Sequence, residues 1–502
     1  MEGMEHNDTV ARHTSDDHPD GSAAVQALAR REDGAPAELT ATPADEGADA
    51  PAPAGEDAPP PLRPRVIVMH ASVGSGHRSA ALAIAQAFEL LRDEAAARRA
   101  AGEADNDDAA GVGAADGDNN TASALPLIPE DYEVEVLDVL DWGRIKFDGD
   151  HAASLFTGAT RPIYDLTWRY TLTGRLLWSG GSVWSRIMFP AFTEHVRKTR
   201  PLAVVCTHIT AANVAVGARM LSGVEFPIVC VPTDYETEGL WPHRGADVFC
   251  VANESMAETL RARKLPEERI RITGIPTRED FRRPYDQRET RERWGLPQDK
   301  TVALALAGAH LPRPYVHFRE ALDKLLPYVH RFQGLHLVLI AGRDEAYARH
   351  LRQAVDDLGL TNVTILDYVE DMAALMAASD LVICKSGGLV VTECLCAQVP
   401  MILLGRAYGQ EKVNVRMLTA LGAAMHVTTA RELLDALRHI EKNPESIRSM
   451  LINGSFLRHP DAARDVARAT FEATQHPKSP DDPLRKKHFL RFYWGGKPAH
   501  TR

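Results

Sequence analysis

The 502-residue chain lacks several features that would mark a secreted or membrane-spanning protein. It has six cysteines but no Cys-x-x-Cys pair, so the sequence indicates neither a disulfide framework nor a paired-cysteine metal site. No apolar run reaches the roughly 18 residues that a membrane-spanning helix needs. The first residues also lack the basic and apolar regions of a secretory signal. We therefore expect a protein of the reducing cytoplasm, with no metal site.

Basic residues are scarce in two segments that together carry all of the excess negative charge. Residues 1–62 hold 14 acidic residues and three arginines, and residues 101–122 hold six acidic residues and no basic one. Both segments are rich in alanine and poor in large apolar side chains. This composition predicts a disordered N-terminus and a disordered acidic insertion. The rest of the chain is close to neutral, so nucleic acid is not an expected partner.

Short apolar runs alternate with helical patterns through the rest of the chain. Such runs, apolar on both faces, are typical of parallel strands covered by helices. The expected strands fall into two sets: 65–70, 132–140, 202–208, 226–234, 247–253 and 269–274, then 301–308, 335–342, 363–369, 380–388 and 399–405. They predict an α/β fold of two doubly wound, Rossmann-like domains, residues 63–283 and 284–476, followed by a basic aromatic tail, 477–502.

The glycine-rich stretch from Gly74 to Ser79 lacks the defining residues of the common phosphate-binding loops. It follows a strand and opens a helix, as those loops do, but it has neither the Walker lysine nor the third glycine of a dinucleotide site. His77 stands there instead, between Gly76 and a helix start whose free N–H groups favour negative charge. A histidine in this place is either a proton acceptor in a reaction or a structural residue that caps the turn.

Three further segments carry polar residues at strand ends. Thr233 and Asp234 end one strand, where Asp234 would orient a histidine or an acceptor hydroxyl, or simply cap the next helix. Ser386, Gly387 and Gly388 leave room for a diphosphate at a helix start. Glu393 would bind ribose from within that helix, or lie on its surface. The last of these segments holds Gln410, Glu411 and Asn414. Their side chains suit sugar hydroxyls or, alternatively, belong to a solvated helix start.

Together these segments resemble the monogalactosyldiacylglycerol synthases and bacterial diacylglycerol glucosyltransferases. The resemblance covers roughly residues 64–440 and lies in SVGSGHRSAALAI, FPIVCVPTDY, RIRITGIPT, YVEDMAALMAASDLVICKSGGLVVTE and GQEKVN. These families are inverting glycosyltransferases of the GT-B fold, in which two Rossmann-like domains face a cleft, and they are related to the muropeptide N-acetylglucosaminyltransferase.

The resemblance implies that the C-terminal domain holds a UDP-sugar and that residues 63–283 form the acceptor and membrane side. The implied donor-binding residues are Gly308, Met372, Ser386, Gly387, Gly388, Thr392, Glu393, Gln410, Glu411 and Asn414. Met372 would frame the uracil, Glu393 the ribose, and the last three residues the sugar. His77 and Asp234 would be catalytic, with Gly74 and Gly76 in the acceptor-side loop. The implied reaction needs no metal or other cofactor.

Two positions depart from the family pattern. A histidine is common between the Thr-Asp motif and Trp241, but this chain has Glu238 there. The glycine-rich loop that opens the C-terminal domain is reduced to LAGAHLPRP, in which Gly308 remains. Two other functions stay open beside the transferase. One is a UDP-sugar 2-epimerase, which shares the two-domain fold. The other is a protein that binds a nucleotide sugar without turnover, as the changes at Glu238 and around Gly308 would allow.

Aromatic and arginine residues gather in residues 155–197, and the tail LRKKHFLRFYWGGK repeats this composition. Such segments fit an interfacial surface, although core aromatics with solvated arginines would give the same composition. We expect a peripheral protein on an anionic membrane, at the cytoplasmic face. Its expected activity is hexose transfer from UDP-glucose or UDP-galactose to diacylglycerol or a related lipid.

Overall fold

The computed structural model describes most of the two expected α/β domains. It describes residues 63–73, 75–101, 128–129, 131–144, 188–236, 241–242, 244–308, 316–407 and 409–477. The predicted acidic segments and basic tail lie outside the described residues, apart from residues 101 and 477. Most of the predicted interfacial segment 155–197 also lies outside them, as do Gly74 and Glu238.

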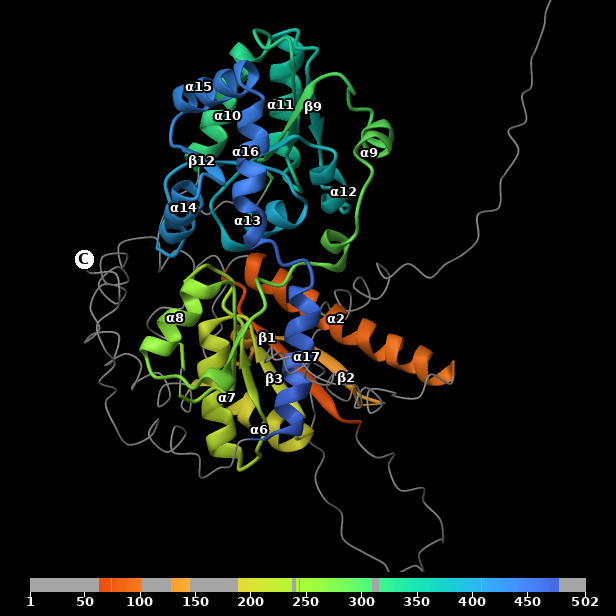
Figure 1. Ribbon diagram of the computed structural model, residues 1–502, viewed down its shortest axis with the longest axis vertical. Coiled ribbons are helices and arrows are strands. Elements are labelled where there is room, and N and C mark those ends of the chain that lie inside the picture. The colour runs from red at the N-terminus through yellow and green to blue at the C-terminus, as the bar shows by residue number, and fades with distance from the viewer. Residues whose placement is uncertain are drawn as a thin grey trace, which may run out of the picture. The chain divides into compact units, whose positions relative to one another are not determined.

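The first sheet is parallel throughout and has the strand order β2-β1-β3-β4-β5-β6. Its apolar strands are buried on both faces because helices cover each side. Helices α6 and α7 pack on one face, and α2 and α17 on the other (Figure 1). The strands and helices of this part are β1 Arg65–His70, α2 Ser75–Ala100, β2 Glu133–Asp138, η3 Val139–Trp142, α6 Pro190–Thr199, β3 Ala203–Cys206, α7 Ile209–Ser222, β4 Ile228–Cys230, β5 Val248–Val251, α8 Glu254–Ala262, η4 Glu267–Arg269, β6 Ile270–Ile272 and η5 Glu279–Arg282.

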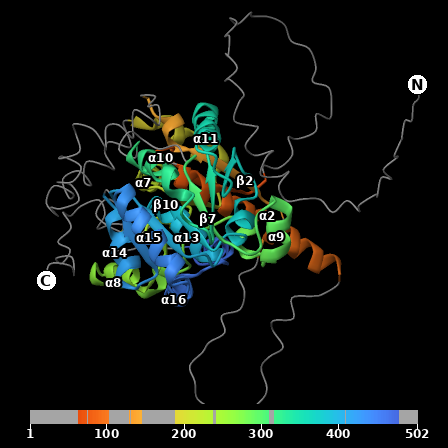
Figure 2. The same ribbon diagram turned by 90° about the horizontal axis from the view of Figure 1, so that it is seen from above.

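The second sheet is also parallel, with the order β12-β11-β10-β7-β8-β9. Read from its other edge, this is the 3-2-1-4-5-6 order of dinucleotide-binding domains. Helices α10, α11 and α15 cover one face, and α12 and α13 the other. Figure 2 shows the structure from above, with α10, α11, α13 and α15 labelled. The elements are α9 Gln287–Trp294, β7 Thr301–Leu306, α10 Val316–Val329, β8 Leu335–Ile340, α11 Glu345–Asp357, β9 Val363–Leu366, α12 Met372–Ala377, β10 Leu381–Cys384, α13 Gly388–Cys396, β11 Met401–Leu404, α14 Glu411–Ala420, β12 Ala424–Val427, α15 Ala430–Lys442, α16 Glu445–Gly454, η7 Ser455–Leu457 and α17 Ala462–Gln475.

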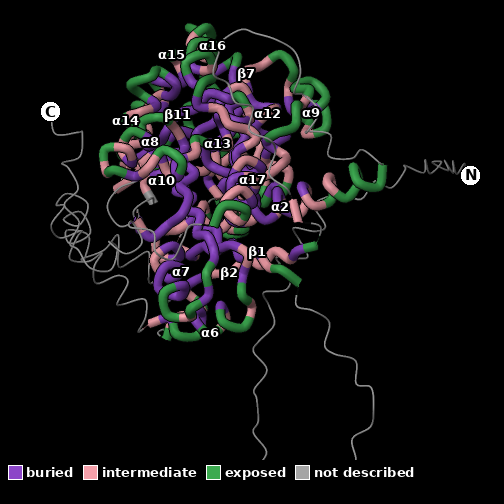
Figure 3. The backbone as a smooth tube through the Cα atoms, turned by 60° about the horizontal axis from the view of Figure 1, so that its bottom comes forward, coloured by how far each residue is buried: buried purple, intermediate pink, exposed green. Residues whose placement is uncertain are grey.

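The predicted fold class, α/β with two doubly wound domains of the GT-B type, is confirmed by these two sheets. All eleven expected strands are present. Most of them are buried, whereas the edge strands β2 and β9 are only partly buried; Figure 3 shows burial along the backbone. Only β12 was not predicted. In each sheet the strand order reverses beside the first strand, between β1 and β3 and between β7 and β10. Ligands of such sheets bind beyond the carboxyl ends of the strands at these reversals.

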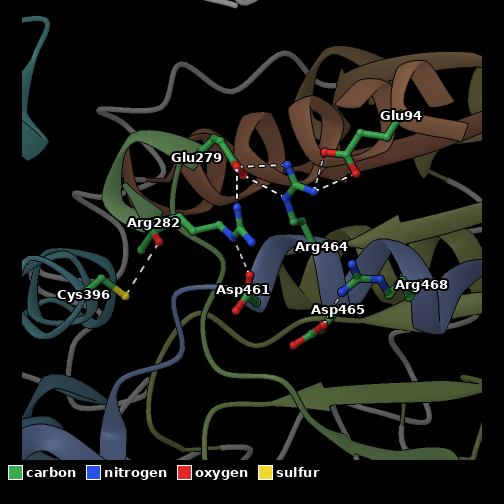
Figure 4. Close-up of polar contacts among 9 residues, drawn as sticks. Glu94, Glu279, Arg282, Cys396, Asp461, Arg464, Asp465 and Arg468 are labelled. Carbon is green, nitrogen blue, oxygen red and sulfur yellow. Dashed lines mark hydrogen bonds and ion pairs between the residues drawn. The ribbon is translucent and has the colours of Figure 1, made fainter. Parts of the chain in front are cut away.

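The last helix, α17, returns to the first sheet although it follows the second sheet in sequence. Phe471 of α17 packs edge-to-face against Phe88 of α2, with their ring centroids 5.2 Å apart. Arg464 of α17 bonds both Glu94 of α2 and Glu279 of η5, as Figure 4 shows. The predicted C-terminal range 284–476 therefore ends with a helix that packs on the N-terminal sheet.

Candidate active site

His77 lies in the first turn of α2, beyond the carboxyl end of β1. Its Nδ1 atom is 3.1 Å from the carbonyl oxygen of Thr207 and 2.8 Å from the hydroxyl of Thr233. A carbonyl oxygen only accepts hydrogen bonds, so this network assigns the ring proton to Nδ1. The Thr207 hydroxyl in turn donates to the backbone carbonyl of His77 at 2.9 Å. The other ring nitrogen, Nε2, is therefore unprotonated and has no hydrogen-bond partner in the described part of the chain.

The surroundings of His77 keep its ring neutral. Burial lowers the pKa of His77 to about 4, against the raising effect of the Thr207 carbonyl, and the charges of His70 and Lys385 lower it further. The ring of His208 packs edge-on against that of His77 at 4.6 Å. A neutral imidazole with this tautomer has a lone pair on Nε2 that can accept a proton.

Asp234 contacts the second domain, and no contact with His77 is found among the described residues. The side-chain amide of Asn414 donates to Oδ1 of Asp234 at 3.2 Å, and the Gly388 N–H bonds the same carboxylate. Burial, partly offset by the Asn414 bond, raises the pKa of Asp234 to about 6. Thr233, and not Asp234, is the residue of this motif that holds His77.

The loop from Thr233 to Tyr235 is docked on helices α13 and α14. The Tyr235 hydroxyl and that of Thr392 are 3.0 Å apart, and the Tyr235 N–H donates to Asn414 Oδ1 at 3.2 Å. A side chain at Gly388 would collide with the carbonyl oxygen of Thr233. Glycine at the start of α13 is thus needed for this close approach between the two domains.

The predicted donor-binding residues Ser386, Gly387 and Gly388 join β10 to α13 at the strand reversal of the second sheet. Gly387 is the N-cap of α13, where free backbone N–H groups favour an anion. Asn414 donates at 2.9 Å to the carbonyl oxygen of Ser386 and is fully buried. The side-chain amide of Asn414 thus bonds Asp234 and Tyr235 in one loop and Ser386 in another, and it holds these two loops together.

Glu393 projects from α13 as a partly buried acid with no hydrogen-bond or ion-pair partner among the described residues. Burial raises its pKa to about 7, against the opposing charge of Arg278. An unpartnered carboxyl at low exposure costs stability, so it points to a ligand that has hydroxyl groups to donate.

The other predicted donor-binding residues differ in the contacts that they make. Glu411 begins α14 beside Lys385, with 3.4 Å between Oε1 and Nζ. Gln410 is the N-cap of α14 and makes no side-chain cap bond. Met372 begins α12 and packs against the core. Gly308 follows β7, and a side chain there would collide with the backbone of Gly342, so a close backbone contact explains this glycine.

Packing explains Trp241 but does not require glycine at position 76. Gly76 lies within α2, and a Cβ atom there would be 3.6 Å from Leu389 Cβ, an ordinary contact. Trp241 is buried and packs edge-on against Phe249 at 6.3 Å.

Sequence reasoning missed Thr207, His208 and Lys385. All three lie at the carboxyl ends of expected strands, and this position is the signal that would have found them. In the part of the chain that the structure describes, no group of three or more His, Cys, Asp or Glu residues is arranged to hold a metal ion. No helix there is long and apolar enough to cross a membrane.

Two protein-family models match the chain, one on each domain. Residues 129–277 match the monogalactosyldiacylglycerol (MGDG) synthase model, and residues 318–466 match the glycosyltransferase family 28 C-terminal domain. The first range includes Thr207 and Asp234, and the second includes Glu393. His77 lies outside both.

Curated relatives of the chain are processive diacylglycerol beta-glucosyltransferases. That of Bacillus pumilus is 29% identical over 238 residues, which are 47% of this chain and 60% of the relative. That of Bacillus subtilis is 28% identical over 235 residues, again 47% and 60%. The alignments thus span less than two thirds of the length of these relatives.

Solved structures with a similar fold are more distant in sequence. MurG of Acinetobacter baumannii has a TM-score of 0.47 at 17% identity, over 80% of this chain and 98% of its own. The UDP-GlcNAc 2-epimerase of Neisseria meningitidis has a TM-score of 0.47 at 12% identity, over 81% and 99%. Similarity at this level says nothing about activity. The family models and curated sequences confirm the resemblance seen in the motifs: the chain is similar to the monogalactosyldiacylglycerol synthases and the bacterial diacylglycerol glucosyltransferases.

Proposed function

We propose that the protein is an inverting glycosyltransferase that moves a hexose from a UDP-sugar to diacylglycerol or a related lipid. The proposal rests on Thr233, which contacts both the candidate proton acceptor, His77, and the candidate anion site at the start of α13. Its hydroxyl holds His77, and its carbonyl oxygen lies against Gly388 at the start of α13. An acceptor hydroxyl at Nε2 and a diphosphate at α13 would thereby be neighbours.

The proposed reaction is a direct displacement at the anomeric carbon of the donor sugar. His77 Nε2 takes the proton of the acceptor hydroxyl as its oxygen bonds to the anomeric carbon. The bond from that carbon to the phosphate oxygen breaks, and UDP leaves with the electron pair. A single displacement inverts the configuration. Backbone N–H groups at α13 would stabilise the charge that develops on the leaving diphosphate.

The side chain of Asp234 would move when the donor binds. Its carboxylate now bonds the Gly388 N–H and the Asn414 amide, where the proposed phosphate would lie. Two anions cannot share this position, so donor binding would displace the Asp234 side chain. Asp234 could then act on the acceptor side, as the sequence predicts.

The remaining donor contacts follow from the predicted residues. Glu393 would accept hydroxyl groups of the ribose, which would give its unpartnered carboxyl a role. Met372 would frame the uracil, and Gln410 and Glu411 would contact the hexose. We propose no cofactor beyond the UDP-sugar itself.

An enzyme with a lipid acceptor acts at a membrane surface. We propose that residues 155–197 and the basic tail attach the protein peripherally to the cytoplasmic face of the membrane. Each tail lysine or arginine near an anionic leaflet would add about 1 kcal/mol. Sedimentation with anionic vesicles tests this attachment. Deleting residues 484–502 should weaken co-sedimentation, and unchanged binding would refute the role of the tail.

The activity itself is tested with purified protein and labelled UDP-glucose or UDP-galactose, with and without diacylglycerol vesicles. Lipid-dependent release of UDP and a labelled glycolipid are the expected results. Isomerised nucleotide sugar without any acceptor would instead identify a UDP-sugar 2-epimerase. Binding of the donor with no turnover in either condition would identify a non-catalytic nucleotide-sugar-binding protein.

A further inference from the structure

Lys385 is a cation at the proposed diphosphate position. It follows β10 directly and precedes Ser386 at the strand reversal of the second sheet. Its Nζ atom would be 3.3 Å from a Cβ atom at Gly387, so the ammonium group lies over the N-cap of α13. The side chain of Lys385 is 30% exposed.

The electrostatic effects of Lys385 reach both catalytic candidates. Its positive charge lowers the pKa of His77 and also lowers the pKa of Asp234. These residues belong to the first domain, whereas Lys385 belongs to the second. The charge of the ammonium group therefore acts on both the proposed proton acceptor and the carboxylate that now occupies the anion position.

The negative charge of the proposed diphosphate exceeds the positive charge of the helix start, and Lys385 could balance the difference. A UDP-sugar brings two negative charges to its diphosphate, and UDP gains a further charge as it leaves. The free N–H groups of one helix start amount to only about half an elementary charge. A lysine ammonium at the same place adds a full charge, and an ammonium–phosphate hydrogen bond is among the strong ones.

We propose that Lys385 binds the diphosphate of the donor and stabilises the departing UDP. This inference rests on the proposed function, because it assumes a UDP-sugar at α13. Glu411 is the partner that Lys385 exchanges for the phosphate. The present 3.4 Å contact from Nζ to Oε1 of Glu411 balances the ammonium charge. With a phosphate bound to Lys385, the carboxylate of Glu411 would contact hexose hydroxyls, as the resemblance implies for it.

The test compares UDP with uridine, because only UDP carries the diphosphate. Binding of both to the full chain is measured by calorimetry for the wild type, Lys385→Met and Lys385→Arg. Lys442→Met serves as the matched control, since Lys442 is an exposed lysine at the end of α15. We expect Lys385→Met to weaken UDP binding roughly tenfold to hundredfold and to leave uridine binding unchanged. Lys385→Arg should restore most of the UDP affinity, and Lys442→Met should behave as the wild type.

The outcomes separate this inference from the proposed function. If Lys385→Met keeps the full preference for UDP over uridine, the role of Lys385 is wrong while the donor site stands. Equal weakening of UDP and uridine would also overturn it, because it would mean a structural role. A wild type that does not prefer UDP over uridine would overturn both the diphosphate site and the role of Lys385. A wild type that prefers UDP but transfers no hexose to lipid would leave Lys385 supported and refute the lipid acceptor.

Discussion

The hydroxyl of Thr233 lies 2.8 Å from Nδ1 of His77, although 156 positions separate the two residues. This contact and the Thr207 carbonyl fix the ring so that Nε2 is the free nitrogen. We expect Thr233→Val to lower kcat by roughly threefold to tenfold, because the ring loses one of its two acceptors. Thr233→Ser should keep most of the activity.

The measurement for this pair of variants is steady-state transfer together with UDP binding. The account requires UDP affinity to stay near that of the wild type in both variants, since the change acts on the acceptor side. Full kcat in Thr233→Val would contradict a positioning role for Thr233.

Asp234 provides a pH-dependent prediction for donor binding. Asp234→Asn should bind UDP-glucose several-fold more tightly than the wild type at pH 7.5, because no carboxylate then competes with the phosphate. The pKa of Asp234 is about 6, so the wild-type side chain loses its charge below that pH. The advantage of the variant should therefore disappear by pH 5.

UDP-glucose is the suitable probe for that experiment because its diphosphate does not titrate in this range. Calorimetry at pH 7.5 and pH 5 gives the two affinities. Weaker binding of UDP-glucose by Asp234→Asn at pH 7.5 would show that the carboxylate does not compete with the donor.

The charged form of Glu393 should lower the free energy of unfolding of the protein. Its pKa rises from 4.5 when unfolded to about 7 when folded, so the folded state holds the proton more tightly. Stability from this group is therefore highest below pH 4.5 and is lost as the pH rises toward 7. Glu393→Gln, which cannot ionise, should be more stable than the wild type at pH 8 by on the order of 2 kcal/mol.

Urea unfolding of both proteins at pH 8 and at pH 4.5 measures that difference, which should be much smaller at the lower pH. The same variant should bind UDP-glucose more weakly. A variant no more stable than the wild type at pH 8 would mean that the carboxyl has a partner that compensates its burial.

Two glycines should respond differently to the same substitution. Gly388→Ala places a methyl group against the Thr233 carbonyl and should disturb the contact between the domains, with a large loss of transfer. Gly76→Ala meets only Leu389 at 3.6 Å and should leave the melting temperature within a few degrees of the wild type. Thermal unfolding and transfer assays compare them, and equal tolerance of both changes would contradict the close approach at Gly388.

The strands and the glycine loops could be predicted because buried parallel strands are continuous apolar runs and loops at their ends need small residues. β12 was not predicted because His426 interrupts its apolar run. The return of α17 to the first sheet could not be predicted, since an amphipathic pattern shows that a helix packs but not on what. His77 was identified by its unusual place in a loop. Its partners Thr207 and Thr233 come from distant strands, and only the folded sheet brings them to it.

The most direct test of the central claim is the initial rate at which labelled hexose from saturating UDP-glucose or UDP-galactose enters extractable lipid. It should be compared in the wild type and in His77→Ala, with UDP affinity measured on the same preparations. The account predicts lipid-dependent transfer by the wild type and a loss of roughly 100-fold or more in the variant, with UDP affinity retained. Full transfer by His77→Ala, or no transfer by a wild type that binds UDP, would contradict it.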